Sequence, residues 1–176
     1  MDWYALFVQT GKEETVQKLL RLHFDEPSLY SIVPKRRLPE RKAGRVHHVA
    51  RKMFPGYVLI KTNMNPAVFY KIRKLPKVYY VVHNQAYSHT SETYYRKIDE
   101  QEMATILQLL GDGEIVDYSR VYLEKSQVII TSGPLQGLEG IINKVDKRKN
   151  RANILVNFMG KEKHIDVGIE ILSKTN

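Results

Sequence analysis

The spacing of apolar and polar residues divides the chain into a part with helical periodicity and a part without it. Nearly continuous apolar runs predict short buried strands at residues 3–8, 29–33, 57–61 and 78–82. Between them, apolar residues three and four apart predict helices that begin after Thr10, at Pro66 and after Asp99. This order predicts an α+β domain in which helices pack on a sheet.

Short polar motifs mark where these helices begin. Thr10 and Glu13 have the spacing of a capping box, and Asp99 with Glu102 forms a partial one. Asn65 precedes a proline, which favours the first helical position. The predicted buried stripes are Val16, Leu19, Leu20 and His23 in the first helix, Val68, Ile72 and Leu75 in the second, and Met103, Ile106, Leu107 and Leu110 in the third.

Residues 34–52 differ from their surroundings because they are strongly basic. Glu40 is the one acid among eight cations, and Gly44 could turn a hairpin. From Tyr118 onward helical periodicity disappears, and strands are predicted at 128–131, 138–145, 152–158 and 163–167. Turns at Gly133-Pro134, Asn150 and Gly160 separate them, which predicts a small β-barrel of about 55 residues. The expected domains are 1–112 and 121–176, with a linker at 113–120.

Composition narrows the class of protein. The net charge of +9 and the pI near 9.6 favour polyanionic partners, nucleic acid first. The absence of cysteine excludes disulfides, thiolate nucleophiles and cysteine zinc sites. No apolar run approaches the ~20 residues that span a bilayer, and no signal peptide is evident at the N-terminus. We therefore expect a cytoplasmic protein that does not bind membranes.

Catalytic chemistry is not predicted. None of the histidines pairs with a nearby acid at metal-ligand spacing: His23, His47, His48, His83, His89 and His164. His23 is expected to pack at the edge of its helix. No glycine-rich phosphate loop or nucleophile elbow is present. We expect no enzymatic activity, cofactor or metal.

Three segments together resemble the NusG family. They are Trp3-Tyr4 in the first strand, Arg51-Lys-Met-Phe-Pro-Gly-Tyr-Val58 before the central strand, and Ser132-Gly-Pro-Leu-Gln-Gly-Leu-Glu-Gly140 in the barrel. The resemblance implies an N-terminal NGN domain and a C-terminal SH3-like KOW barrel. The basic hairpin and the cations at 144–151 look most similar to the LoaP-type specialised antiterminators.

The resemblance also implies a site for RNA polymerase. An aromatic pocket would receive the clamp helices of the polymerase, and its residues would be Trp3, Phe54, Pro55 and Tyr57. Tyr70 and Lys71 would approach the gate loop of the polymerase and lie off the buried stripe of their helix. The alternative for the aromatic residues is that their rings fill the core.

Two groups of cations are candidates for nucleic-acid binding. In the hairpin, Lys35, Arg36, Arg37, Arg41, Lys42 and Arg45 could follow a phosphate backbone, which the family places at non-template DNA. In the barrel, two neighbouring turns would form a single positive face for an RNA hairpin in a nascent leader: Lys144, Lys147, Arg148, Lys149 and Arg151, with Lys161, Lys163 and His164. The alternative for both groups is a solvated surface.

Phe158 and Met159 match only loosely the stretch that docks ribosomal protein S10 or Rho in the general factor, and a barrel-core role is the alternative. The sequence thus predicts a monomeric, operon-specific antitermination factor. A general NusG-type elongation factor, a ribosome-associated RNA-binding protein and an enzyme acting on nucleic acid stay open as alternatives.

Overall fold

The computed structural model describes residues 1–84, 94–125 and 127–172, and the predicted loop at 83–97 lies largely outside them. The chain divides into two compact units. The first unit consists of Met1–Val33 and Phe54–Met103, and the second of Pro34–Met53 and Ala104–Asn176. The basic hairpin, which the sequence assigns to the N-terminal domain, thus groups with the C-terminal strands.

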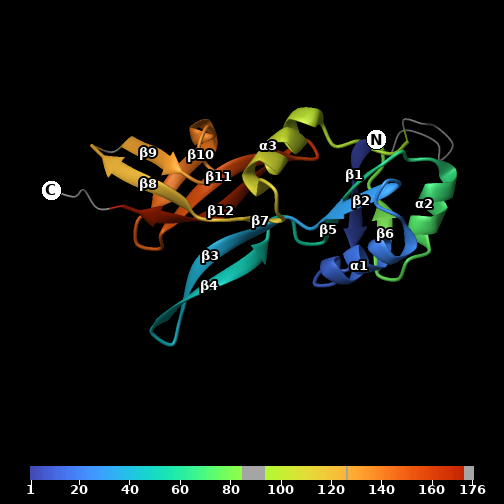
Figure 1. Ribbon diagram of the computed structural model, residues 1–176, viewed down its shortest axis with the longest axis horizontal. Helices are drawn as coiled ribbons and strands as arrows, with labels where there is room; N and C mark the ends of the chain where they lie inside the picture. The colour runs from blue at the N-terminus through green and yellow to red at the C-terminus, as the bar shows by residue number, and fades with distance from the viewer. Residues whose placement is uncertain (85–93, 126, 173–176) are drawn as a thin grey trace. The chain divides into compact units, whose positions relative to one another are not determined.

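The first unit is built on a four-stranded antiparallel sheet with the order β2-β5-β1-β6 (Figure 1). Its strands are β1 (Asp2–Val8), β2 (Leu29–Ile32), β5 (Tyr57–Thr62) and β6 (Val78–Val81). Leu6 and Ile60 on the sheet share a buried core with Leu20 of α1 (Glu13–His23) and Ile72 of α2 (Pro66–Arg73). Both helices therefore pack on one face of this sheet, and the four predicted strands are confirmed.

The predicted capping box of α1 is wrong. Lys12 is the N-cap residue and makes no side-chain capping bond, while Thr10 is exposed. The Glu13 side chain is fully buried and instead accepts a hydrogen bond from the backbone N–H of Gly56. His23 is exposed, so its predicted packing is also wrong.

The other two helix starts are confirmed. The Asn65 side chain accepts a hydrogen bond from the Val68 N–H at 3.0 Å and caps α2. Asp99 accepts hydrogen bonds from the first turn of α3 (Glu100–Leu110). Leu107 is 37% exposed whereas Leu109 is buried, so the predicted stripe of α3 is wrong at that position.

In the second unit, the basic segment forms a regular hairpin. Its strands β3 (Lys35–Lys42) and β4 (Arg45–Lys52) pair over their full length without a register shift. Ala43 and Gly44 both have positive φ, as a two-residue hairpin turn requires. β7 (Ile115–Val116) pairs with β3 in parallel and completes a three-stranded sheet.

The remaining strands form a five-stranded sheet with the order β10-β11-β12-β8-β9. They are β8 (Ser119–Glu124), β9 (Gln127–Ser132), β10 (Ile142–Asp146), β11 (Arg151–Phe158) and β12 (Lys161–Ile171). A 3₁₀ turn occupies Glu139–Ile141, so the strand predicted from Leu138 begins only at Ile142. β7 and the start of β8 occupy the expected linker, and the domain boundaries stay a prediction.

The Gly133-Pro134 turn is held against the start of β8. A Cβ on Gly133, whose φ is +100°, would lie 2.6 Å from the Cα of Ser119. The Ser119 hydroxyl accepts a hydrogen bond of 2.9 Å from the buried Leu135 N–H. Only glycine fits this approach, which explains the glycine of the Gly-Pro motif.

Among residues 1–84, 94–125 and 127–172, the longest helices are α1 and α3, each with 11 residues. No helix in this part of the chain has the length and apolar character needed to cross a bilayer.

Candidate functional sites

Four aromatic rings gather on the first unit. Phe7 lies at the centre, with ring centroids 5.4 Å from Tyr57, 5.1 Å from Tyr80 and 5.6 Å from Tyr79. The strand register places Phe7 directly between Tyr57 of β5 and Tyr80 of β6. We refer to Phe7, Tyr57, Tyr79 and Tyr80 as the aromatic patch.

The aromatic patch is accessible. Tyr79 and Tyr80 are 54% and 44% exposed, while Phe7 and Tyr57 are half-buried between them. Burial raises the pKa of Tyr57, with a smaller contribution from Tyr80, so its hydroxyl is neutral at physiological pH. The patch thus offers apolar rings with polar hydroxyl tips, which suits protein docking.

The structure brings only part of the predicted pocket to this patch. Tyr57 belongs to the patch. Pro55, two residues before Tyr57 in the sequence, is exposed, but Phe54 is only 4% exposed and lies in the core. Trp3 packs edge-on against Tyr30 instead, with centroids 6.0 Å apart. Four residue steps along β1, about 13 Å, separate Trp3 from Phe7.

Tyr70 and Lys71 differ in what they contact. Tyr70 is 57% exposed and packs edge-on against Phe69. The Lys71 ammonium donates a hydrogen bond to the His23 carbonyl and lies 4.4 Å from the centroid of the Phe24 ring. Lys71 is exposed, as predicted, but it also ties α2 to the end of α1.

The hairpin cations are not equivalent. Lys35, Arg36 and Arg37 are half-buried, and Arg37 pairs with both oxygens of Asp117 at 3.3 Å. Arg41, Lys42 and Arg45 near the turn are exposed. The cations near the turn are therefore the ones most accessible to a phosphate backbone.

Glu40, the one acid of the hairpin, is engaged by Arg51. Two hydrogen bonds of 3.0 and 2.7 Å join the guanidinium to the carboxylate. These bonds hold the pKa of Glu40 below its usual value. Glu40 therefore neutralises Arg51 rather than the cations near the turn.

The two turns that carry most of the barrel cations lie apart. In the β11–β12 register, Arg151 lies opposite Gly168 whereas Phe158 lies opposite Lys161. The turn at 147–150 and the turn before Lys161 are thus at opposite ends of β11, about 23 Å apart. The predicted merger of these two turns is wrong.

Individual barrel residues have distinct environments. Lys144, Lys147, Arg148, Lys149, Lys161, Lys163 and His164 are exposed, and Arg151 is half-buried. His164 lies 3.2 Å from the Asn153 side chain, on the outer face of the sheet. Phe158 is 3% exposed and belongs to the barrel core, and Met159 is half-buried in the turn.

In the described part of the chain, no three His, Asp or Glu side chains converge on a possible metal ion. The first 107 residues match the family model of the transcription termination factor NusG. The chain belongs to the NusG family. Members of this family are transcription factors and not enzymes, and the NGN-plus-KOW fold accounts for the α+β architecture.

Whole-chain relatives agree with this assignment. The NusG transcription termination/antitermination protein of Pasteurella multocida is 27% identical over 99% of this chain and 95% of its own length. Its counterpart in Neisseria meningitidis serogroup B is 25% identical over 99% and 98%. A solved structure of Thermotoga maritima NusG, described as showing a domain interaction, covers 95% of this chain and 93% of its own with a TM-score of 0.58 and 23% identity. That likeness confirms the fold.

Sequence reasoning missed Phe7, Tyr79 and Tyr80. Phe7 lies between Leu6 and Val8 in a continuous apolar run, which gives no indication that one face of the strand is accessible. The adjacent pair Tyr79-Tyr80 could have signalled a surface, because tyrosine combines an apolar ring with a polar tip.

Proposed function

We propose that this NusG-family transcription factor is an operon-specific antitermination factor. Its NGN domain, 1–112, binds the clamp of RNA polymerase, and its KOW domain, 121–176, binds a hairpin in the nascent leader RNA. The observation that carries the proposal is the separation of two surfaces: the aromatic patch lies on the first unit, and the exposed cations of the turn at 147–150 lie on the second.

The aromatic patch supports a protein partner. Large rings lose little entropy on binding and often dominate interface energetics. Tyr79 and Tyr80 are more exposed than most tyrosines of the described chain, and Phe7 supplies an apolar floor between them and Tyr57. A coiled-coil of the polymerase clamp would present the apolar side chains that such a surface accepts.

The barrel turn supports an RNA partner. Lys147, Arg148 and Lys149 are all exposed on one short connection between β10 and β11. Each phosphate that they neutralise releases counterions, and arginine can additionally read guanine edges. Because the major groove of duplex RNA is narrow, we expect contacts at a loop or bulge.

The two surfaces would act together through binding alone, without making or breaking a covalent bond. RNA held by the barrel keeps the factor at high effective concentration beside the transcribing enzyme. Docking of the aromatic patch then favours the polymerase conformation that elongates and disfavours the paused one. S10 or Rho has no part in the proposal because Phe158 lies in the barrel core.

Binding assays on the full chain test the two surfaces separately. Tyr79→Ala with Tyr80→Ala should abolish capture of RNA polymerase while leaving affinity for the leader RNA unchanged. Leu22→Ala is the matched control, because Leu22 is 78% exposed on α1 and lies outside the aromatic patch. Unchanged polymerase capture by the double variant would overturn the docking assignment.

A general NusG-type elongation factor is the second candidate, and the names of the two relatives favour it. Crosslinking the protein to RNA in its native cell and sequencing the bound transcripts separates the two. Reads on one or a few leader hairpins support the operon-specific factor, whereas reads spread over most transcripts support the general one.

A further inference from the structure

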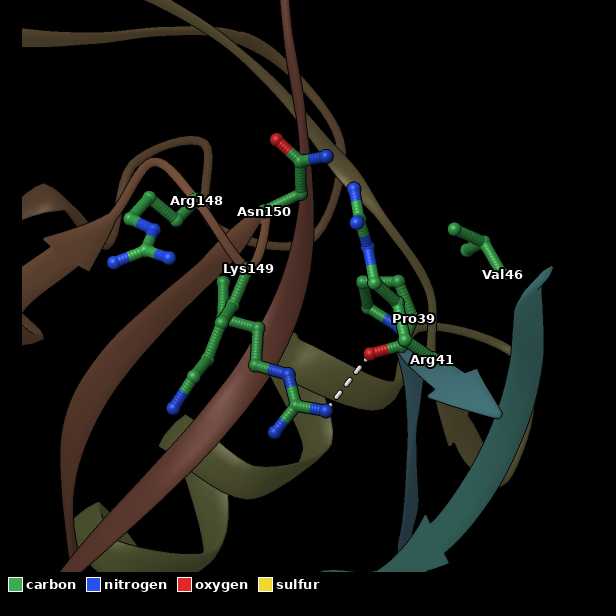
Figure 2. Close-up of a pocket in the computed structure, with 7 residues that line it drawn as sticks. Pro39, Arg41, Val46, Arg148, Lys149 and Asn150 are labelled. Carbon is green, nitrogen blue, oxygen red and sulfur yellow. Dashed lines mark hydrogen bonds between the residues drawn. The ribbon is translucent and has the colours of Figure 1, made fainter. Parts of the chain in front are cut away.

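A cavity opens between the hairpin and the β10–β11 turn within the second unit. It has a volume of about 350 Å³ and is lined by Pro39, Arg41, Val46, Arg148, Lys149, Asn150 and Arg151. Figure 2 shows the hairpin residues on one side and Arg148, Lys149 and Asn150 on the other. We refer to this cavity as the basic cleft.

The walls of the basic cleft are joined by specific contacts. The Arg151 guanidinium donates a hydrogen bond of 2.8 Å to the Pro39 carbonyl, the dashed line in Figure 2. Beside the cleft, a Cβ on Gly168 would lie 2.1 Å from the Tyr118 ring and 2.7 Å from the Arg37 carbonyl oxygen. The absence of a side chain at position 168 therefore lets β12 approach the hairpin backbone closely.

A further contact, on the same side of the hairpin as the Arg151–Pro39 hydrogen bond, also joins the hairpin to the rest of the second unit. The His48 ring lies edge-on to the Tyr118 ring, with centroids 5.4 Å apart, and the two side chains are hydrogen bonded. His48 is the strand partner of Pro39, so this contact holds the hairpin beside the cleft. None of these contacts uses Arg41 or Arg148, which leaves both guanidiniums available for a ligand.

The charge of the basic cleft is not balanced by its own walls. No carboxylate is among the described residues that line it. Lys149 lies 4.0 Å from Asp146, a weak pair at a largely exposed side chain, and Arg151 lies 3.8 Å from Asp166. Arg41 and Arg148 make no ion pair within the described chain. Two opposing walls of like charge favour a polyanion between them.

The shape of the basic cleft indicates more than a single phosphate. Its volume falls in the range of small-ligand sites, about 300–1,000 Å³. Arg41 lies directly opposite Val46 across the hairpin strands, so a cationic and an apolar side chain stand next to each other. A nucleotide offers the matching pair, an anionic phosphate and an apolar sugar or base face.

We infer that the basic cleft binds the sugar–phosphate backbone of one RNA strand, with the hairpin and the barrel turn as its two walls. This inference rests on the proposed function for the choice of RNA as the ligand. It adds that Arg41 and Arg148 contact the same strand. The hairpin cations and the barrel cations therefore form one composite site rather than two separate ones.

The test uses the full chain with fluorescein-labelled oligouridine, and oligothymidine as its DNA counterpart, over a series of salt concentrations. Arg41→Ala and Arg148→Ala should each weaken oligouridine binding and each make the slope of log affinity against log salt less negative by about 0.7. The double variant should make that slope less negative by about 1.4, because both side chains contact one ligand. Lys18→Ala, which removes an exposed charge from α1, is the control.

The possible outcomes distinguish failure of the composite site from failure of the proposed function. If Arg148→Ala weakens binding and Arg41→Ala changes neither affinity nor slope, the barrel turn binds alone and the composite site is wrong. If the double variant changes the slope no more than Arg148→Ala alone, the shared strand is wrong. If wild type binds oligothymidine more tightly than oligouridine, the assignment to RNA is wrong. If wild type binds neither oligouridine nor a leader hairpin, both the composite site and the proposed function are wrong.

Discussion

The Glu13 carboxylate accepts a hydrogen bond of 2.8 Å from the backbone N–H of Gly56. Glu13 is the first residue of α1, and Gly56 lies in the Phe-Pro-Gly-Tyr segment immediately before β5. Gly56 has a φ of +85°, and a Cβ there would lie 3.3 Å from the Phe7 ring. The same contact therefore fixes the start of α1 and the approach of Tyr57 to Phe7.

Replacing Glu13 by alanine should lower the free energy of unfolding by about 1–3 kcal/mol, since the buried Gly56 N–H loses its acceptor. Glu13→Gln, which keeps an amide oxygen, should recover most of the loss. Urea denaturation measures the change, with Glu26→Ala at an exposed site as control. An equal effect of Glu13→Ala and Glu26→Ala would show that the contact contributes nothing.

The Asn65 cap allows a second prediction. Asn65→Ala should destabilise the protein by about 0.5–2 kcal/mol, because the Val68 N–H at the start of α2 loses its side-chain acceptor. Asn63→Ala is the matched control: the exposed Asn63 contributes only its backbone carbonyl to Asn65. Thermal unfolding of the two variants should differ clearly, and identical midpoints would contradict the capping role.

These two helix starts show which helix caps can be predicted from the sequence. Asn65-Pro66 was predictable because the cap and its partner are three residues apart. The Thr10–Glu13 capping box was wrong because Gly56, 43 residues away, binds the Glu13 carboxylate. Spacing along the chain cannot reveal such a tertiary competitor.

The candidate sites were only partly predictable for a related reason. Periodicity shows that residues 3–8 form a strand but not which of its faces is covered, so Phe7 was missed and the buried Phe54 was included. Likewise, the turns at 147–150 and before Lys161 are near in sequence, yet β11 runs its full length between them. Register, which the sequence does not specify, separates them.

Gly168→Ala should destabilise the second unit by about 1–3 kcal/mol, since the added methyl group would overlap the Tyr118 ring and the Arg37 carbonyl oxygen. Gly140→Ala is the matched control, because a Cβ there meets no atom within 4 Å and Gly140 has no positive φ. Chemical denaturation of both variants measures the difference. A Gly168→Ala protein as stable as Gly140→Ala would mean that the hairpin and the barrel do not approach this closely in solution.

Acidification should loosen the Glu40–Arg51 pair. The hydrogen bonds from Arg51 lower the pKa of Glu40 below the ordinary value of 4.5 in the folded hairpin. The pair therefore contributes stability above pH 4.5, and this contribution is lost as the pH falls through the lowered pKa. NMR titration of the Glu40 carboxyl carbon should show its pKa rising toward 4.5 in Arg51→Ala. No change would indicate that the pair does not form, and Lys18→Ala serves as the charge-matched control.

The alternation of side chains along the hairpin has one more consequence. Arg41 and Val46 line the basic cleft, whereas the paired Lys42 and Arg45 project from the opposite surface of the same two strands. A ligand in the cleft and a ligand on that opposite surface would not displace each other. The hairpin therefore presents two separate cationic surfaces, with its backbone as the partition between them.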